Sequence, residues 1–400
     1  MKKGWEVQKL GDVCQLQLGK TPYRKNPNFW DKEKTSGNIW LSIADLKHGE
    51  YVSSSAEQVS DLGAKDIVKI PQGTMLLSFK LTLGRVSFAG TDLYTNEAIA
   101  ALLNLNEKIS KDFLFYYFSL FDWDKEAEGD VKVKGKTLNK KKLNELPIIV
   151  PPLAEQKRIV AILDETFAAI DRAKANAEKN LANAKELFES YLNGIFTNPG
   201  EDWEIGCLDE LGTITSSKRI YKSEYVKDGV PFYRTKEIKE LSNGKTITLE
   251  LFISRERYNQ IKRSFGVPKI GDLLLSAVGT IGEIMVIENE NEFYFKDGNI
   301  VWFKDFKKLD TKYLKYALTA FVEKIKNLAI GAAYSALTIE KLNRYKIGFP
   351  KTIDEQKKIV CQIDAYRTEI QQLETIYRQK IDALDELKKS ILKKAFEGEL

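Results

Sequence analysis

The residue types that most often carry catalysis are scarce in this sequence. Its 400 residues include one histidine, His48, and three cysteines, Cys14, Cys207 and Cys361, without paired spacing. Catalytic triads and zinc sites need histidine or cysteine side chains in sets. We therefore expect no metal, no cofactor and no disulfide framework, and the free cysteines favour a reducing compartment. We expect His48, which precedes Gly49, to lie in a turn.

Two short motifs come close to nucleotide or methyl-donor chemistry without matching it. Gly135-Lys136-Thr137 ends like a phosphate-binding loop, but five residues separate Gly129 from Gly135 where that loop needs four. Asn26-Pro27-Asn28-Phe29 is similar to the Asn-Pro-Pro-Tyr motif of amino-methyltransferases, but Asn28 replaces the second proline. We expect no catalytic residue in this chain.

Basic residues mixed with aromatic and amide residues point instead to nucleic acid. Lys and Arg neutralise phosphates, and Arg, Asn and Gln side chains read base edges. The candidate DNA-binding residues, which we expect in loop-like stretches, are Lys20, Tyr23, Arg24, Lys25, Lys80, Thr82, Arg85 and Lys134 in the first half and Lys218, Arg219, Lys222, Arg234, Lys236, Arg255, Arg257, Lys262 and Arg263 in the second. The net charge of +5 permits DNA binding without requiring it. A solvated surface is the alternative for any one cluster, but recurrence in two halves favours binding.

One turn motif also recurs. Residues 78–84 (SFKLTLG) match residues 276–282 (SAVGTIG), and in both a predicted strand ends in a serine followed by a Thr-x-Gly turn. The glycine permits an unusual backbone angle and a close approach to a ligand. A purely structural turn fits this pattern equally well.

The elements that must position these residues are duplicated. Residues 154–160 (AEQKRIV) return as residues 354–360 (DEQKKIV), each after a proline, and Trp5-Glu6-Val7 returns as Trp203-Glu204-Ile205. Apolar runs predict strands near residues 39–43, 75–79, 86–88 and 99–103 in the first half and near 231–234, 272–276, 283–287 and 299–303 in the second. Helices are expected over residues 111–121 and 311–328. Each half is therefore a mixed α/β domain.

A long helix follows each domain. Apolar residues recur at steps of four and three in both, which is a heptad pattern typical of paired helices. The candidate residues of the helix–helix seam are Ile159, Leu163, Ile170, Leu187, Ile359, Ile363, Ile370, Leu373, Leu384 and Leu387. Small residues in one seam, such as Ala173, hold the place of large ones in the other, such as Leu373, and this favours pairing of the two helices. The alternative is that each helix packs on its own domain.

At this point the chain resembles the specificity subunit of a type I restriction-modification system. The resemblance covers all 400 residues and rests on the two junctions at residues 146–156 (LPIIVPPLAEQ) and 345–356 (YKIGFPKTIDEQ), with the opening Trp-Glu and Leu10-Gly11-Asp12. It implies an α+β, pseudo-two-fold chain: target recognition domains over residues 1–150 and 199–349, and long spacer helices over 151–198 and 350–400 that form an antiparallel coiled coil.

The resemblance also implies a function. Each domain would read one half of a bipartite duplex DNA target, and the helix pair would set the spacing and dock two adenine methyltransferase (modification) subunits. Restriction and translocase subunits would complete the complex, and this chain would not be a catalyst. The N-terminus has no apolar signal core and no apolar run approaches the ~18 residues of a membrane span, so we expect a cytoplasmic protein without membrane contact.

Two other classes remain open from the sequence. The chain could be a methyltransferase or nuclease with an unfamiliar site, in which case it would modify or cleave DNA without partners. It could also be a coiled-coil scaffold, in which case duplex DNA would not bind or would bind without a salt dependence.

Overall fold

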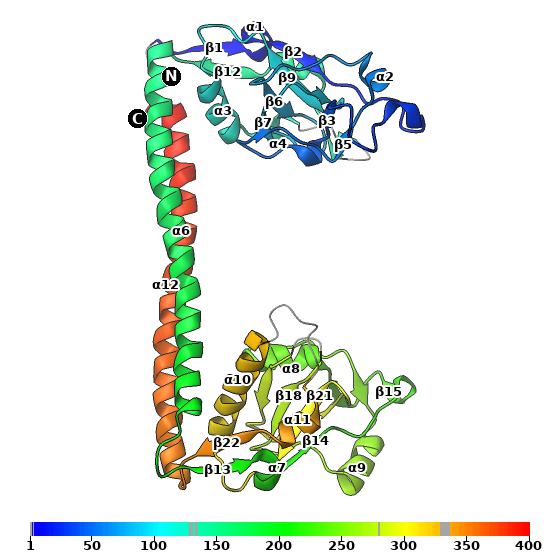
Figure 1. The fold of residues 1–400 in the computed structure, drawn as a ribbon, viewed down its shortest axis with the longest axis vertical. Helices are drawn as coiled ribbons and strands as arrows, with labels where there is room; N and C mark the ends of the chain where they lie inside the picture. Colours follow the sequence, from blue (N-terminus) through cyan, green and yellow to red (C-terminus); the bar gives the residue numbers. More distant parts are fainter. Residues whose placement is uncertain (1, 3, 128–130, 133–134, 279–280, 329–336) are drawn as a thin grey trace. The chain divides into compact units, whose positions relative to one another are not determined.

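The computed structural model describes residue 2 and residues 4–127, 131–132, 135–278, 281–328 and 337–400. The chain divides into two compact units: unit 1 comprises Met1–Asn176 with Lys380–Leu400, and unit 2 comprises Ala177–Gln379. Each unit contains one mixed domain and parts of both long helices (Figure 1).

Unit 1 is built on a five-stranded sheet of order β2-β9-β6-β7-β4 and a three-stranded sheet of order β5-β3-β8. The main-sheet strands are β2 (Gln15–Leu18), β4 (Tyr51–Val52), β6 (Met75–Ser78), β7 (Val86–Ala89) and β9 (Ile99–Leu103). The small sheet contains β3 (Ile39–Leu41), β5 (Glu57–Gln58) and β8 (Tyr94–Thr95). Two further pairs are β1 (Glu6–Lys9) with β12 (Pro147–Val150), and β10 (Val131–Lys132) with β11 (Gly135–Lys136). The helices of the domain are α1 (Leu10–Val13), α2 (Asp61–Ala64), α3 (Lys111–Leu120), α4 (Trp123–Glu126) and α5 (Lys140–Asn144), with 3-10 turns η1 (Pro27–Phe29) and η2 (Ile43–Asp45).

Unit 2 repeats this plan with a four-stranded sheet of order β14-β21-β18-β19 and a second of order β15-β17-β16-β20. Its strands are β13 (Glu204–Cys207), β14 (Thr213–Thr215), β15 (Tyr225–Val226), β16 (Val230–Tyr233), β17 (Phe252–Ile253), β18 (Leu273–Ser276), β19 (Ile284–Val286), β20 (Tyr294–Phe295), β21 (Ile300–Lys304) and β22 (Lys346–Phe349). Its helices are α7 (Leu208–Leu211), α8 (Thr235–Ser242), α9 (Arg255–Ser264), α10 (Thr311–Leu328) and α11 (Ile339–Asn343), with a 3-10 turn η3 (Lys222–Glu224). The strand and helix ranges predicted from the sequence are confirmed to within a few residues in both units.

The two long helices, α6 (Leu153–Thr197) and α12 (Ile353–Glu397), are 45 residues each, or about 68 Å at ~1.5 Å per residue. In unit 1 they run antiparallel, because Asp171 of α6 pairs with Lys388 of α12 and Lys174 pairs with Asp385. In unit 2 the Tyr191 and Tyr366 rings lie 4.4 Å apart and Arg367 lies over the ring of Phe188 at 5.2 Å, so the helices run antiparallel there too. The predicted antiparallel helix pair is confirmed.

The helices complete the core of each unit. In unit 1, Ile159 and Leu163 of α6 and Phe396 of α12 join the core formed by the main sheet and α3. In unit 2, Leu192 of α6 and Ile363 of α12 join the core formed with α10. Unit 1 thus uses the start of α6 and the end of α12, and unit 2 uses the start of α12 and the end of α6. The units repeat one another with the roles of the two helices exchanged.

One buried glutamine per unit ties each long helix to its domain. The Gln156 side chain accepts a hydrogen bond from Ser110 N–H (2.8 Å) and donates to the carbonyls of Lys108 (2.9 Å) and Pro151 (2.8 Å). Gln356 repeats all three bonds, with Asp310 N–H and the carbonyls of Lys308 and Pro350. Both side chains are fully buried, so the repeated Glu-Gln-Lys motif has a structural reason.

None of the helices in the described ranges is both long and apolar enough to pass through a bilayer.

Candidate nucleic-acid interface

Sheet topology gathers the basic clusters of unit 1 at one end of its main sheet. Strands β2 and β6 both pair antiparallel with β9, with Leu18 opposite Ala100 and Ser78 opposite Ile99. Both strands therefore end where β9 begins. Three loops meet there, residues 19–25, 79–85 and 95–98, and we name them the first loop cluster (Figure 1).

Unit 2 has the same arrangement. Strands β14 and β18 pair antiparallel with β21, with Thr215 opposite Trp302 and Ser276 opposite Ile300. Residues 216–222, 277–278, 281–283 and 296–299 meet at this end and form the second loop cluster. In unit 1 two predicted basic clusters, at residues 20–25 and 80–85, are thus brought together, whereas the second loop cluster joins one predicted basic cluster, residues 218–222, to the predicted Thr-x-Gly turn.

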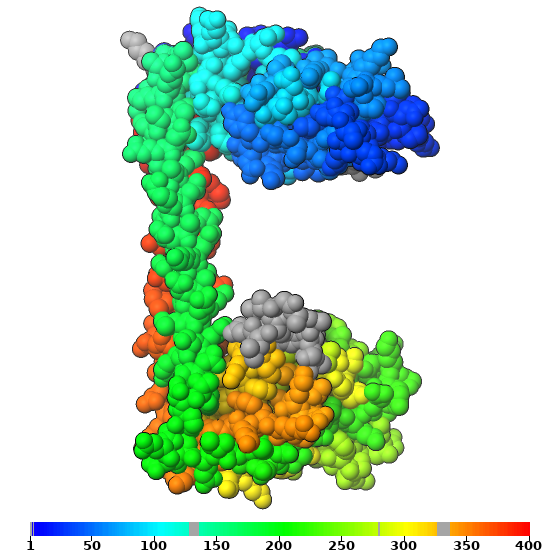
Figure 2. All heavy atoms as spheres, in the orientation of Figure 1, coloured from blue at the N-terminus to red at the C-terminus, as the bar shows by residue number. Residues whose placement is uncertain are grey.

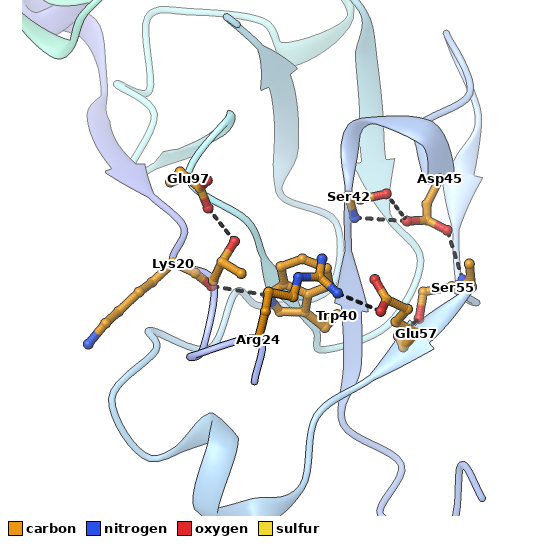
Figure 3. Close-up of polar contacts among 10 residues, drawn as sticks. Lys20, Arg24, Trp40, Ser42, Asp45, Ser55, Glu57 and Glu97 are labelled. Carbon is orange, nitrogen blue, oxygen red and sulfur yellow. Dashed lines mark hydrogen bonds and ion pairs between the residues drawn. The ribbon is translucent and has the colours of Figure 1, made fainter. Parts of the chain in front are cut away.

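The first loop of unit 1 is anchored by backbone hydrogen bonds and by the Thr21 side chain, whereas the Lys20 side chain points away from the fold (Figure 3). Lys20 N–H donates to the Thr95 carbonyl (2.8 Å), and the Lys20 carbonyl accepts from Trp40 Nε1 (3.0 Å). Thr21 Oγ1 donates to the Glu97 carboxylate. A Cβ at Gly19 would lie 2.0 Å from the Thr95 carbonyl oxygen, so glycine is required there. Lys20, Tyr23 and Lys25 are exposed at this surface.

Arg24 has a different environment from its neighbours. Its guanidinium carbon lies 4.2 Å from the ring centroid of Trp30 and 4.8 Å from that of Trp40, and Nη1 lies 2.5 Å from Glu57 Oε1. The guanidinium therefore contacts a carboxylate and two aromatic rings, although its side chain is still 51% exposed (Figure 3). Through Trp40 of β3 and Glu57 of β5, Arg24 thus contributes to the small sheet.

The turn between β6 and β7 is held by one buried serine. Ser78 Oγ donates to the Thr82 carbonyl (2.5 Å) and accepts from Arg85 N–H (2.9 Å), while Gly84 N–H donates to the Ser78 carbonyl (2.9 Å). Ser276 accepts from Glu283 and Gly282 N–H in the same way. Gly84 has φ +75° and Gly282 has φ +96°, so the predicted unusual backbone angle is confirmed. The close neighbour of Gly84 is the Trp123 indole, 2.2 Å from a built Cβ.

This turn lines an open cavity of about 870 Å³. Its polar lining comprises Ser42, Lys80, Thr82, Arg85, Asn96, Glu97 and Thr137. Arg85 Nη1 donates to the carbonyls of Ile43 (3.2 Å) and Leu46 (3.1 Å), so part of its donor capacity holds the η2 turn in place. Lys80, Thr82 and Arg85 are thus together, as the sequence predicts. Asn96 and Glu97, which the sequence analysis did not single out, complete the lining.

In unit 2 the first loop is also pinned to the sheet. Lys218 N–H donates to Tyr294 Oη (2.6 Å), Ser216 Oγ donates to the Ile300 carbonyl (3.2 Å), and Ile220 is buried. Arg219 Nε lies 2.7 Å from Asp297 Oδ2, and this hydrogen bond raises the pKa of the arginine. Lys218 and Lys222 are exposed.

The remaining candidates of unit 2 lie mostly on helices, which corrects the expectation of loops. Ser254 caps α9 by accepting from Arg257 N–H (3.1 Å), and Tyr258 and Ile261, three positions apart, bury one face. That apolar face is only two residues wide, so the surrounding charges hid it in the sequence. The four candidates on α9 are Arg255, Arg257, Lys262 and Arg263, and Lys236 lies on α8.

Most of these cations already pair with carboxylates. Arg234 Nη2 lies 2.6 Å from Glu237 Oε1 and 2.7 Å from Glu250 Oε2, and Lys236 Nζ lies 2.8 Å from Glu250 Oε1. The hydrogen bonds from Lys236 and then Arg234 lower the pKa of Glu250 to about 2. On α9, Arg255 and Lys262 share Glu292, and Arg257 Nε lies 2.7 Å from Glu224 Oε1. These pairs reduce the positive charge that this surface offers to phosphates.

Lys134 lies outside the described residues. Among the described candidates, the lysines and arginines that make no ion pair with another described residue are Lys20, Lys25, Lys80, Arg85, Lys218, Lys222 and Arg263. All but Arg263 belong to the two loop clusters, which are therefore the strongest electrostatic candidates.

The seam residues of the long helices divide into two groups. Ile159, Leu163, Ile170, Ile363 and Ile370 are buried, and Ile359 and Leu384 are partly buried. Leu187, Leu373 and Leu387 are exposed, by 50%, 39% and 46%, so the structure does not bury the whole predicted seam. In a two-helix pair, each helix is covered by its partner along one face only. Heptad spacing alone does not determine which of the apolar residues lie on that covered face.

The described residues contain no group of three His, Cys, Asp or Glu side chains that could hold a metal ion. All three cysteines are free, and burial raises the pKa of the Cys14 thiol to about 12, which disfavours the reactive thiolate.

Comparisons with known proteins agree with this geometry. The sequence pattern of the family "Type I restriction modification DNA specificity domain" matches residues 2–180 and again 200–382. A putative type I restriction enzyme specificity subunit of Haemophilus influenzae is 30% identical over 67% of this chain and 67% of its own length. The MjaVIII specificity subunit of Methanocaldococcus jannaschii is 25% identical over 99% of this chain and 93% of its own length.

Solved structures show the same fold. A chain from work on complex assembly and conformational transition of the type I R-M system aligns over 100% of this chain and 99% of its own, with a TM-score of 0.76 and 19% identity. The HsdS subunit of Thermoanaerobacter tengcongensis aligns over 100% and 98%, with a TM-score of 0.61 and 19% identity.

Proposed function

Because the chain belongs to the family of type I restriction-modification DNA specificity proteins, we propose that each of its two units reads one half of a bipartite duplex DNA target. The chain itself is not an enzyme but a specificity subunit. The observation that carries the proposal is the pair of loop clusters. They occupy the same end of the same kind of sheet in both units but carry different side chains, as two different half-sites require.

The chemistry of the loop clusters suits a DNA duplex. Lys20, Lys25 and Lys80, which make no ion pair with another described residue, would neutralise phosphates in one half-site, and Lys218 and Lys222 would do so in the other. In the first loop cluster, neutral donors and acceptors such as Thr82 and Asn96 line the same cavity as Lys80 and can meet base edges.

The same proposal covers the partners. Two adenine methyltransferase subunits would dock on the long helices and adjoining strands, and restriction or translocase subunits would join the complete complex in the cytoplasm. Exposed apolar residues at matching places support one partner surface used twice: Leu187 (50% exposed) matches Leu387 (46%), and Val7 (55%) matches Ile205 (65%). In the space-filling view, much of the visible face of α6 is open to solvent in both units (Figure 2).

The decisive experiment is to express the chain with its methyltransferase subunit in a cell without other modification systems and to map methyladenine across the genome. A bipartite motif with two different half-sites is expected. Methylation or cleavage by the isolated chain would contradict the assignment as a specificity subunit, and a complex that modifies no defined motif would contradict the reading function.

The contribution of the loop clusters is tested on the same complex. Lys20→Ala with Lys25→Ala and Lys80→Ala should weaken binding to the mapped duplex and lower the salt slope by about 0.9 for each lost phosphate contact. Lys108→Ala is the matched control, because Lys108 is exposed beyond the end of β9, at the opposite end of the same sheet. Equal effects of the triple variant and the control would count against the first loop cluster.

Docking has its own test. Leu187→Lys and Leu387→Lys would each place a charge in an apolar contact, and each should remove one methyltransferase subunit from the complex, as measured by native mass spectrometry. Leu62→Lys, on α2 and 56% exposed, is the control. Retention of both subunits by both variants would place the docking surface elsewhere.

A further inference from the structure

The tip of the β6–β7 turn carries an apolar side chain in a backbone conformation that such residues rarely adopt. Leu81 has φ +63°, and its side chain is 54% exposed. The other non-glycine residues with positive φ in the described ranges are Lys34, Asn104 and Asp305, all polar. Left-handed backbone is unfavourable for a leucine and persists only when the surrounding structure enforces it.

The surrounding structure does enforce it. Leu81 N–H donates to the Lys136 carbonyl (2.9 Å), and Thr82 N–H donates to the Lys80 carbonyl (2.8 Å). Lys80 also forms a bridge with Thr137, and buried Ser78 holds the Thr82 carbonyl. These contacts hold the backbone of the turn from both sides and keep Leu81 at its positive φ, with the residue 54% exposed.

The surroundings of this side chain match a duplex. Leu81 lines the 870 Å³ cavity together with Lys80, Thr82 and Asn96. Lys80 makes no ion pair with a described carboxylate, so a phosphate is a natural partner for it. Leu81 thus lies between Lys80, which can bind a phosphate, and Thr82 and Asn96, which can bind base edges. The apolar group that DNA offers in such a position is the 5-methyl group of thymine in the major groove.

The matching turn of unit 2 differs at this point. With Ser276 aligned to Ser78, the residue in place of Leu81 is Gly279 and the residue in place of Lys80 is Val278, which is 40% exposed. In unit 2 the apolar residue therefore stands one position earlier than in unit 1, in the place of the lysine. Such a difference is expected of side chains that read different half-sites.

From this geometry we propose that Leu81 is a specificity-determining residue of unit 1 and that its side chain contacts a thymine 5-methyl group in one half-site. This role rests on the proposed reading of bipartite DNA by the two units.

The test uses the chain in complex with its methyltransferase subunit. Methyladenine is mapped for wild type, Leu81→Ala, Leu81→Gly and the control Leu62→Ala. Both Leu81 variants should relax one position of one half-site by about fivefold, the effect of one buried methyl group. The other half-site and the control should not change. Because glycine tolerates positive φ, Leu81→Gly should retain the fold. Both variants remove the leucine side chain but only glycine also loosens the backbone, so equal effects would assign the relaxation to the side chain.

A second measurement uses synthetic duplexes carrying the mapped motif, with each thymine of the relaxed half-site replaced in turn by uracil, which lacks the methyl group. One replacement should lower methylation by wild type about fivefold and leave the Leu81→Ala complex unaffected. An unchanged motif for both Leu81 variants, or equal sensitivity of wild type and variant to uracil, would overturn the role of Leu81. Absence of any bipartite motif with wild type would instead overturn the reading function itself.

Discussion

At the scale of single residues, Gln156 and Gln356 show why a short motif is repeated in this chain. Each amide satisfies one N–H and two carbonyls that the proline stop and the preceding loop leave without partners. A buried polar group that loses its partner costs about 1–3 kcal/mol. The motif therefore marks the attachment of each long helix, independently of which DNA is bound.

Gln156→Leu should destabilise unit 1 by about 2–4 kcal/mol, because three backbone groups lose a buried partner while the volume is kept. Hydrogen exchange on the full chain should speed up at the Ser110 amide, the donor to Gln156. Gln356→Leu should act likewise at Asp310. Gln362→Leu, exposed on α12, is the control and should change stability by less than about 0.5 kcal/mol. Unaltered exchange at Ser110 would refute this role.

His48 gives unit 1 a pH dependence. Its Nδ1 accepts from Val86 N–H (3.2 Å), and its ring lies 5.2 Å from that of Phe115. Desolvation, and then the charge of Arg85, lower its pKa below 6.5. Protonation of His48 is thus less favourable in the folded state than in the unfolded chain. The contribution of neutral His48 to the free energy of unfolding is complete above pH 6.5 and is lost as the pH falls through the lowered pKa.

We therefore expect unit 1 to lose stability as the pH falls from about 6.5 toward the lowered pKa of His48. Chemical denaturation at a series of pH values measures it, and His48→Asn, whose amide oxygen can still accept from Val86, should flatten the curve in this range. As the sequence has one histidine, its NMR titration reports the pKa directly. A titration midpoint at or above 6.5 would contradict the assignment.

At the scale of elements, the antiparallel contact of α6 and α12 in unit 1 carries two ion pairs. Lys174 Nζ lies 2.7 Å from Asp385 Oδ1, and Lys388 Nζ lies 2.9 Å from Asp171 Oδ1. These side chains are partly exposed, so each pair contributes little by itself. Their value is in fixing register, because a slipped helix would bring like charges together.

Charge reversal tests that register. Lys174→Asp or Asp385→Lys alone should destabilise unit 1 by up to about 1 kcal/mol, and the double variant should lose less than the sum of the two, with a coupling of about 0.2–1 kcal/mol that fades in high salt. Denaturation of the four proteins at low and high salt gives the cycle. Additive losses in the double variant would show that these residues do not face each other in solution.

At the scale of the whole molecule, the long helices are proposed to set the distance between half-sites. Insertion of one heptad into the middle of both α6 and α12 adds about 10 Å of helix, or about three base pairs of duplex. The mapped motif should keep both half-sites and gain about three base pairs of spacer. An insertion in α6 alone breaks the register of the pair and is the control. Altered half-sites with an unchanged spacer would contradict the proposal that the long helices set the distance between half-sites.

Much of this plan follows from local sequence signals. Heptad spacing, proline stops and repeated segments are periodic and short-range, so they predicted the long helices, the duplication and most strands. The Gly84 and Gly282 turns were also foreseeable, because positive φ selects glycine. The short apolar face of α9 was not foreseeable, since it consists of only Tyr258 and Ile261 among charged residues.

What the sequence determined by itself was therefore the family, the two-fold repetition and the absence of familiar catalytic sets. Only the tertiary structure decided which charged residues are available to a ligand. Arg24, Arg234 and Arg257 have carboxylate partners 16 to 33 positions away in the chain, whereas Lys20 and Lys80 have none among the described residues. The positive φ of Leu81, which identifies it as a candidate specificity residue, is likewise imposed by its neighbours in the structure. Pairing and strain depend on contacts between distant segments, and residue spacing does not encode them.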